Sequence, residues 1–171
     1  SFNKNVINQI GNTTINLYKN NRIGTVIKHI PGHGLSKQDT HYKLPYISNK
    51  LEYLKNNDFI TFKNKKSIFA MTAHIVFEAL DKENCATHSK KVIKYIRNKI
   101  GFKNIIISDD ISMKALKYSF SENVSKAYSS GCNLVLHCNA NFREMSNLGK
   151  IAPKVNRFVI KKTSEFYKLL S

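Results

Sequence analysis

The chain has little of what stabilises small secreted proteins or anchors membrane proteins. Its 171 residues include three cysteines, three prolines and no tryptophan. The odd cysteine count and the absence of a C-x-x-C pair argue against a disulfide framework or a zinc knuckle. No apolar run approaches the roughly 18 residues of a membrane-spanning helix, and the opening SFNKNVINQI lacks the apolar segment of a signal peptide. We therefore expect a cytoplasmic protein with no membrane partner.

Acidic residues are also scarce: 11 stand against 28 lysines and arginines, which gives a formal net charge of +17. Such an excess suggests a basic nucleic-acid-binding domain. However, only four of the basic residues are arginines, and the lysines are scattered among asparagines, as in KNNDFITFKNKK. Specific nucleic-acid readers rely on arginine forks and stacking aromatics. The composition therefore favours a solvated basic surface, and nucleic-acid binding ranks third among the function hypotheses.

Four short apolar runs, each followed by polar residues, alternate with helical patterns. We expect strands near 23–28, 67–72, 104–108 and 133–137. Helices are expected over 2–20, 47–57, 87–100, within 112–131, and over 141–150 and 154–170. Alternation of this kind predicts an α/β fold with a parallel sheet, and strands that are apolar throughout indicate that both faces are covered. We also expect Cys132 and Cys138, which flank the last run, to be small buried hydrophobes.

The polar clusters stand at the carboxyl ends of the expected strands. They are Lys28–His29, Thr72–His74, Ser108–Asp110 and His137–Asn139. Carboxyl ends of parallel strands lie at one edge of the sheet, where α/β enzymes and (β/α) barrels hold their active sites. We therefore expect Lys28, His29, His74 and Asp109 to lie at one rim.

The densest cluster is VIKHIPGHGLSKQDTH, residues 26–41. One interpretation is a metal site made by His29, His33, Asp39 and His41, but the spacing suits no common zinc pattern, so we expect no metal. Another is a phosphate cradle, but neither a Rossmann fingerprint nor a P-loop appears in the sequence. A further interpretation is a mobile catalytic loop, in which Gly32 and Gly34 supply unusual backbone angles and His33 is structural. The catalytic-loop interpretation also explains why the loop continues into the polar run LSKQDT.

Five segments carry a family resemblance: KHIPGHG, DTH, MTAHI, IRNKIGFKNIIISDDISMKAL and SGCNLVLHCN. In this order they resemble the signature segments of glycoside hydrolase family 3, and most closely its bacterial β-N-acetylglucosaminidase (β-hexosaminidase) branch of cytoplasmic peptidoglycan-recycling enzymes. The resemblance covers nearly the whole chain. It implies a (β/α)8 TIM barrel and retaining hydrolysis of terminal β-linked N-acetylglucosamine, from peptidoglycan fragments or related oligosaccharides, with no cofactor.

The same resemblance assigns roles to individual residues. It implies that Asp109 is the nucleophile, that His41 with its partner Asp39 is the acid/base, and that Lys28 and His29 bind sugar hydroxyls. A carboxylate beside an imidazole orients the ring and favours its protonated form, which suits proton donation to a leaving oxygen.

Residues around these positions have supporting expectations. Strand alternation turns Asp110 away from Asp109, so that Asp110 orders the rim; the alternative for this pair is a helix cap. His74 is expected either to support the rim or to be a buried histidine with satisfied hydrogen bonds.

The chain also departs from the family pattern. A TIM barrel needs roughly 250 residues, whereas 171 residues supply about four strand–helix units, and the family's G-C-D appears as GCN with Asn133. We interpret residues 1–171 as a partial catalytic domain, the C-terminal half of the barrel without the N-terminal half. A separate half-barrel chain would then complete the enzyme, and this chain alone would be inactive, with two open sheet edges and an apolar face. The alternative is a non-catalytic remnant or interaction subunit.

Overall fold

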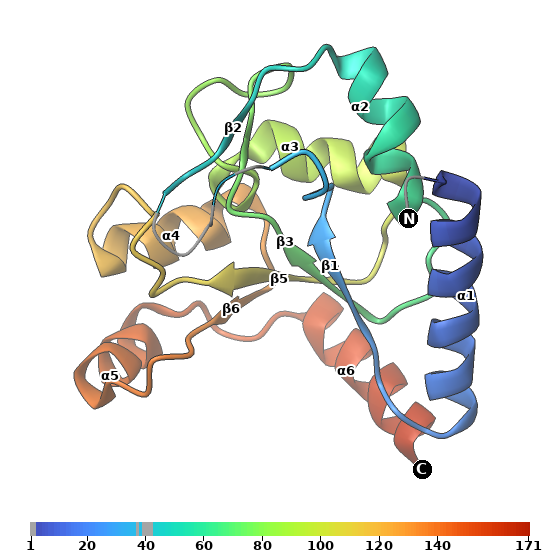
Figure 1. Cartoon of the computed structure of the whole chain (residues 1–171). Helices are drawn as coiled ribbons and strands as arrows, with labels where there is room; N and C mark the ends of the chain where they lie inside the picture. The colour runs from blue at the N-terminus through green and yellow to red at the C-terminus, as the bar shows by residue number, and fades with distance from the viewer. Residues whose placement is uncertain (1–2, 37, 39–42) are drawn as a thin grey trace.

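A four-stranded parallel sheet forms the centre of the molecule (Figure 1). The computed structural model describes residues 3–36, 38 and 43–171. The strands lie in the order β1 (Val26–Ile30), β3 (Phe69–Thr72), β5 (Ile105–Asp110) and β6 (Leu134–Leu136), and every neighbouring pair is parallel. Each strand therefore lies beside the next one in the chain, as in an arc of a barrel. The predicted α/β fold with four parallel strands is confirmed.

Helical segments connect and flank the strands. They are α1 (Lys4–Asn20), α2 (Leu51–Asn57), the 3-10 turns Phe59–Phe62 and Ala86–His88, α3 (Lys90–Tyr95) with the π turn Ile96–Ile100, α4 (Phe120–Ser130), α5 (Phe142–Ile151) and α6 (Arg157–Leu170). Those between the strands cover one face of the sheet, whereas α6 packs against Phe69 of β3 through Phe166. The main core lies between the sheet and α2, α3 and α4, where Ala70 and Ile106 join Val92, Ile96 and Val124 in one buried cluster. The burial of these side chains holds the sheet against its crossovers.

Local signals explain where the central helices begin and end. The Ser89 side chain caps α3 by accepting the N–H of Val92, and Gly101, with φ 85°, ends the following π turn. Ser119 and Glu122 form a reciprocal capping box at the start of α4. The helix predicted within 112–131 therefore begins only at Phe120, and it ends, as predicted, at Gly131, whose φ is 111°.

The first part of the sheet differs from the prediction in the bounds of one strand and in a small additional sheet. The strand predicted at 23–28 runs over Val26–Ile30, because its ladder with β3 begins where Val26 faces Phe69. The preceding residues instead pack on α6, where a Cβ at Gly24 would overlap the Phe166 ring. A second, two-stranded sheet, β2 (Tyr46–Ile47) with β4 (Val76–Phe77), was also not predicted.

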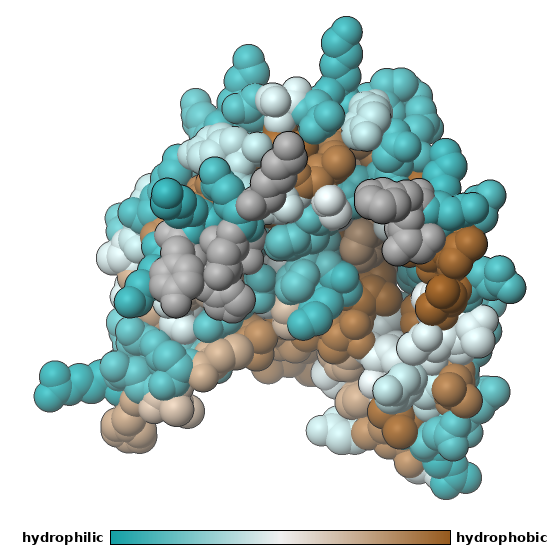
Figure 2. Space-filling view, in the orientation of Figure 1, coloured by the Kyte–Doolittle hydropathy of each residue, from teal (hydrophilic) through white to brown (hydrophobic). Residues whose placement is uncertain are grey.

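The sheet has two outer strands in the described part of the chain, because β1 and β6 each pair with one neighbour only. Val26 on β1 is 44% exposed. On the face opposite the core, Phe69, Met71, Ile107 and Leu134 are only partly buried. Figure 2 shows hydrophobic surface gathered in a hollow in the lower middle of this view. The expected open edges and incompletely covered apolar face are both present.

Among the described helices, none combines the length and the hydropathy needed to span a bilayer. The longest, α1, has 17 residues and buries only Ile15.

Candidate active site

His29 and Asp109 meet at the carboxyl-end rim of the sheet. The Nε2 atom of His29, in β1, lies 3.6 Å from Oδ2 of Asp109, in β5. Because Ile106 belongs to the core, alternation places Ile107 and Asp109 on the opposite face. Burial lowers the pKa of His29, and the nearby Asp109 carboxylate opposes that effect. His29 is therefore a neutral imidazole at neutral pH, able to donate or accept a hydrogen bond beside a carboxylate.

His74 ties the end of β3 to the end of β5. It is fully buried, and its Nε2 atom lies 3.1 Å from the backbone oxygen of Asp110. A carbonyl only accepts, so Nε2 carries the proton and donates it. Nδ1 then accepts the hydroxyl proton of Thr87, 2.8 Å away. His74 thus meets both expectations: it is buried with both ring nitrogens hydrogen-bonded, and it supports the rim. Burial lowers its pKa.

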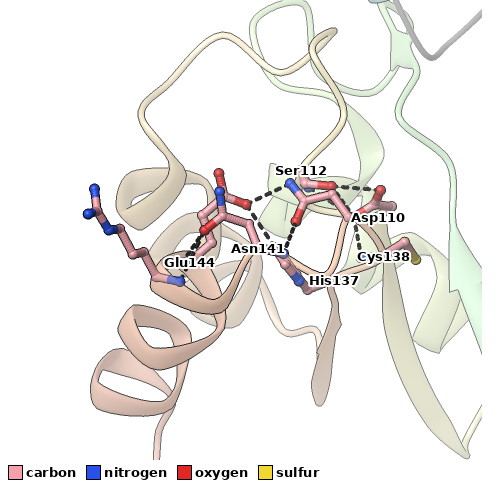
Figure 3. A network of polar contacts seen from close by, with 8 residues as sticks. Asp110, Ser112, His137, Cys138, Asn141 and Glu144 are labelled. Carbon is pink, nitrogen blue, oxygen red and sulfur yellow. Dashed lines mark hydrogen bonds and ion pairs between the residues drawn. The ribbon is translucent and has the colours of Figure 1, made fainter.

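Asp110 points away from Asp109 and organises the loops behind it. Its Oδ1 accepts from the Ser112 N–H at 3.0 Å and from the Cys138 N–H at 3.1 Å. Figure 3 shows this carboxylate between the turn after β5 and the segment after β6. The predicted rim-ordering role is present in these contacts. Cys138, however, is exposed, so the prediction of a buried thiol there is wrong, whereas Cys132 is buried as expected. Cys138 lies beyond β6, where the chain has already left the sheet.

A second polar group holds the segment after β6. The sequence singled out its members His137 and Asn139 at the strand end, but not Asn141 and Glu144. His137 Nε2 lies 2.8 Å from Glu144 Oε2, and Asn139 donates to the same oxygen at 2.8 Å. These hydrogen bonds lower the pKa of Glu144. Asn141 caps α5 beneath them by accepting the Arg143 N–H (Figure 3). The spacing from His137 to Glu144 across a helix cap was the only signal available in the sequence.

Asp58 is a further residue that the sequence did not single out. It follows α2, yet its carboxyl group lies against the PGHG turn, where a Cβ at Gly32 would overlap its Cγ and Oδ2 atoms. Among the described glycines, Gly101 and Gly131 have positive φ angles, whereas Gly32 and Gly34 do not. The predicted reason for these turn glycines, unusual backbone angles, is therefore wrong. Gly32 is needed for space, because any side chain would displace the Asp58 carboxylate.

Of the remaining predicted site residues, the structure describes Lys28 but not Asp39 or His41. Lys28 lies exposed in β1, next to His29. Asp39 and His41 lie outside the described residues. Of the metal quartet considered above, His29 and His33 have ring centroids 5.2 Å apart. No group of three or more metal-binding side chains occurs among residues 3–36, 38 and 43–171, so the full quartet stays untested.

Asn133, where the family pattern has aspartate, lies at the opposite end of the sheet from the rim. Its Oδ1 accepts from Arg97 Nη2 at 2.8 Å and from the Ile106 N–H at 2.9 Å. Arg97 also donates to the backbone oxygens of Phe102 and Asn104. Asn133 therefore keeps the geometry of a carboxylate–guanidinium contact without the negative charge, and its departure from the pattern lies away from the candidate site.

Comparisons with known proteins identify the family of the chain. The sequence model described as "Glycosyl hydrolase family 3 N terminal domain" matches residues 1–161. A β-hexosaminidase of Photobacterium profundum is 35% identical over 123 residues, which are 68% of this chain and 36% of that protein.

Solved structures share the fold. The family 3 β-N-acetylglucosaminidase of Paenibacillus sp. str. FPU-7 superposes with a TM-score of 0.81 at 23% identity, over 95% of this chain and 33% of the other. The β-N-acetylglucosaminidase of Thermotoga maritima is 30% identical, with a TM-score of 0.65, over 86% of this chain and 35% of the other. The chain thus spans about a third of the length of these relatives. From its matched segments and its fold, the chain belongs to glycosyl hydrolase family 3.

Proposed function

We propose that residues 1–171 are the C-terminal half of a family 3 catalytic barrel that hydrolyses terminal β-linked N-acetylglucosamine with retention of configuration. The observation that carries the proposal is the Asp109 carboxylate, held 3.6 Å from the half-buried His29 on the rim of a parallel sheet. Retaining glycosidases need one such carboxylate as nucleophile, placed beside groups that hold the sugar. The names of the Paenibacillus and Thermotoga maritima relatives support the choice of sugar.

In the first step an Asp109 oxygen would form a bond to the anomeric carbon while the bond to the leaving oxygen breaks. His41, oriented by Asp39, would give its proton to that leaving oxygen. Water would then attack the glycosyl–Asp109 ester, His41 would take a proton from the water, and the carboxylate would be released. Neutral His29 and the exposed ammonium of Lys28 would hold sugar hydroxyls beside the reacting carbon. The reaction proposed here uses no cofactor.

We place the natural substrate among peptidoglycan fragments and related oligosaccharides, and the enzyme in the cytoplasm. Support comes from the family branch that the five sequence segments resemble and from the β-hexosaminidase relative. The proposed acid/base is His41 and not a second carboxylic acid. A neutral imidazole places no negative charge of its own beside the Asp109 intermediate.

The rest of the sugar site would come from the N-terminal half of the barrel. The support is the open β1 and β6 edges of the sheet and the relatives' greater length. Without that half, a substrate would be loosely held, and catalysis that depends on positioning would fail. We therefore expect the 171-residue chain alone to be inactive.

Co-expression tests this proposal. The chain is produced with an N-terminal half from a family 3 relative, the complex is purified, and hydrolysis of a chromogenic β-N-acetylglucosaminide is measured. We expect activity in the complex, none in either half alone, and a loss of at least about 10³-fold in a D109N complex, as for removal of a nucleophile. A folded complex without hydrolysis would favour the non-catalytic remnant, and full activity of D109N would refute the assignment of Asp109.

A further inference from the structure

The Asp58 carboxyl group is packed against the backbone of the loop that leads toward the assigned acid/base. Its Oδ1 lies 3.5 Å from the position that a Cβ at Gly34 would take, and its Cγ and Oδ2 occupy the space a Cβ at Gly32 would need. The backbone N–H groups of His33 and Gly34 lie close enough to favour the charged form of this carboxylate, and so does the nearby His33 imidazole. Successive N–H groups that converge on one anion fix the turn that carries them.

This contact has a cost in stability. The Oδ2 atom of Asp58 is buried and has no hydrogen-bond partner. Burial raises the pKa of Asp58, although the two N–H groups and the nearby His33 oppose that effect. Since the pKa is raised on folding, the ionised group is less favourable in the folded than in the unfolded chain. Ionisation of Asp58 therefore lowers the free energy of unfolding once the pH rises above the ordinary pKa of aspartate.

In Asp81, elsewhere in the chain, hydrogen bonds to the carboxylate outweigh the effect of burial on the pKa. Its carboxylate accepts hydrogen bonds from the Ser89 hydroxyl at 2.6 Å and from the backbone N–H groups of Glu83 and Asn84. These bonds lower its pKa even though burial acts to raise it. Asp81 therefore stabilises the fold at neutral pH, whereas Asp58 does not. A buried acid that weakens the fold is the kind of exception expected at a functional position.

We propose that Asp58 is a positioning residue: its carboxylate fixes the Gly32–Gly34 turn and, through it, the start of the segment that continues to His41. The proposal rests on the proposed function for its catalytic consequence, but the anchoring of the turn stands on the contacts alone. Nothing in the role requires Asp58 to touch the sugar. It acts on the acid/base step through the backbone of the turn.

Amide hydrogen exchange tests the anchoring without any need for activity. D58N and D81N are each made in the 171-residue chain, and exchange is followed by mass spectrometry. We expect D58N to speed exchange of peptides covering residues 32–36 by about tenfold or more, because the turn loses its ionised acceptor. D81N should speed exchange only around residues 81–89. Equal exchange at residues 32–36 in wild type and D58N would overturn the proposal.

The pH dependence of stability separates anchoring from ordinary packing. Relative to D58N, the wild type should lose unfolding free energy as the pH rises above about 4, because the raised pKa of Asp58 disfavours its charge. Relative to D81N, the wild type should gain unfolding free energy over the same rise. His33 faces Asp58, so both series are repeated with H33N to remove its charge. A gain with pH in the Asp58 pair, with or without His33, would contradict the stability cost.

Leaving-group dependence tests the catalytic consequence in the complemented enzyme. The value of kcat/KM reports the first step, in which a poor leaving group needs a proton and a dinitrophenolate does not. We expect D58N to lower kcat/KM by about ten- to a hundredfold for an oligosaccharide, and to leave it nearly unchanged for the dinitrophenyl glycoside. Equal losses on both substrates, or none on either, would overturn the positioning role. If the wild-type complex is inactive, the proposed function fails instead, and the exchange comparison alone decides the anchoring.

Discussion

Replacement of Asn133 by aspartate should stabilise this chain. The half-buried guanidinium of Arg97 donates to three oxygens: the Asn133 side chain and the backbone of Phe102 and Asn104. No carboxylate pairs with Arg97 among the described residues, and burial lowers its pKa. N133D would keep the Oδ1 contacts to Arg97 and to the Ile106 N–H while adding the missing negative charge.

The size of the gain follows from the change in one hydrogen bond. A neutral hydrogen bond contributes about 1 kcal/mol and one between charged groups about 1.5–3 kcal/mol, so the exchange gains roughly 1 kcal/mol after the cost of burying the carboxylate. For a chain of this length, 1 kcal/mol corresponds to a rise of about 2–4 °C in Tm. The gain should disappear as the pH falls below about 4, where the new carboxylate is protonated.

Thermal unfolding of four variants isolates the Arg97 contact. The double-mutant cycle compares N133D in the wild-type and R97Q backgrounds, and N12D on the exposed face of α1 controls for the reduction of the +17 net charge. We expect N133D to raise Tm more than N12D, and R97Q to abolish the difference. A decrease in Tm, or an increase that survives R97Q, would refute the role given to Asn133.

Three further changes follow from the packing and from the buried groups. G32A should destabilise the chain by about 1–3 kcal/mol, because its methyl group overlaps the Asp58 carboxylate, and D58A should recover most of that loss; additive losses in urea unfolding would contradict the overlap. Burial lowers the pKa of His88 from 6.5 to about 4, so about 3 kcal/mol of unfolding free energy should be lost as the pH falls through 6.5 toward 4. H88Q should flatten that part of the pH profile, and an unchanged profile would exclude His88 as its source. S89A should cost about 2 kcal/mol or more, because it removes both the cap on the Val92 N–H and the hydrogen bond to the Asp81 carboxylate, and a Tm equal to wild type would show that both contacts are dispensable.

The sequence predicted the sheet well because its strands are unusual. Each is an almost continuous apolar run, and a run of that length followed by polar residues has few alternatives to a buried parallel strand. The helix boundaries were less predictable. Residues 112–119 have a helical pattern, but the Asp110 carboxylate captures the N–H of Ser112 and sets a turn there instead. A side-chain contact of this kind outweighs propensity and leaves no periodic signal.

The site residues divide in the same way. Asp109, His29 and His74 were predictable, because strand ends converge wherever a sheet is parallel. Asp58 was not, since its contact with Gly32 joins the end of a helix to a turn 26 positions earlier. Nothing in the run NNDFITF indicates that one acid faces another loop. Contacts between loops depend on how the helices pack, and that information becomes available only with the fold.

The most direct test of the account is to trap the covalent intermediate on Asp109. The complemented enzyme is incubated with 5-fluoro-N-acetylglucosaminyl fluoride, in which ring fluorine slows both steps and the fluoride leaving group lets the first proceed faster. Mass spectrometry of the chain should show one added glycosyl group, on the peptide containing Asp109, and none in a D109N complex. A label on Asp110, or steady hydrolysis by an enzyme that never acquires the glycosyl group, would contradict the central claim that Asp109 is the nucleophile of a retaining glycosidase.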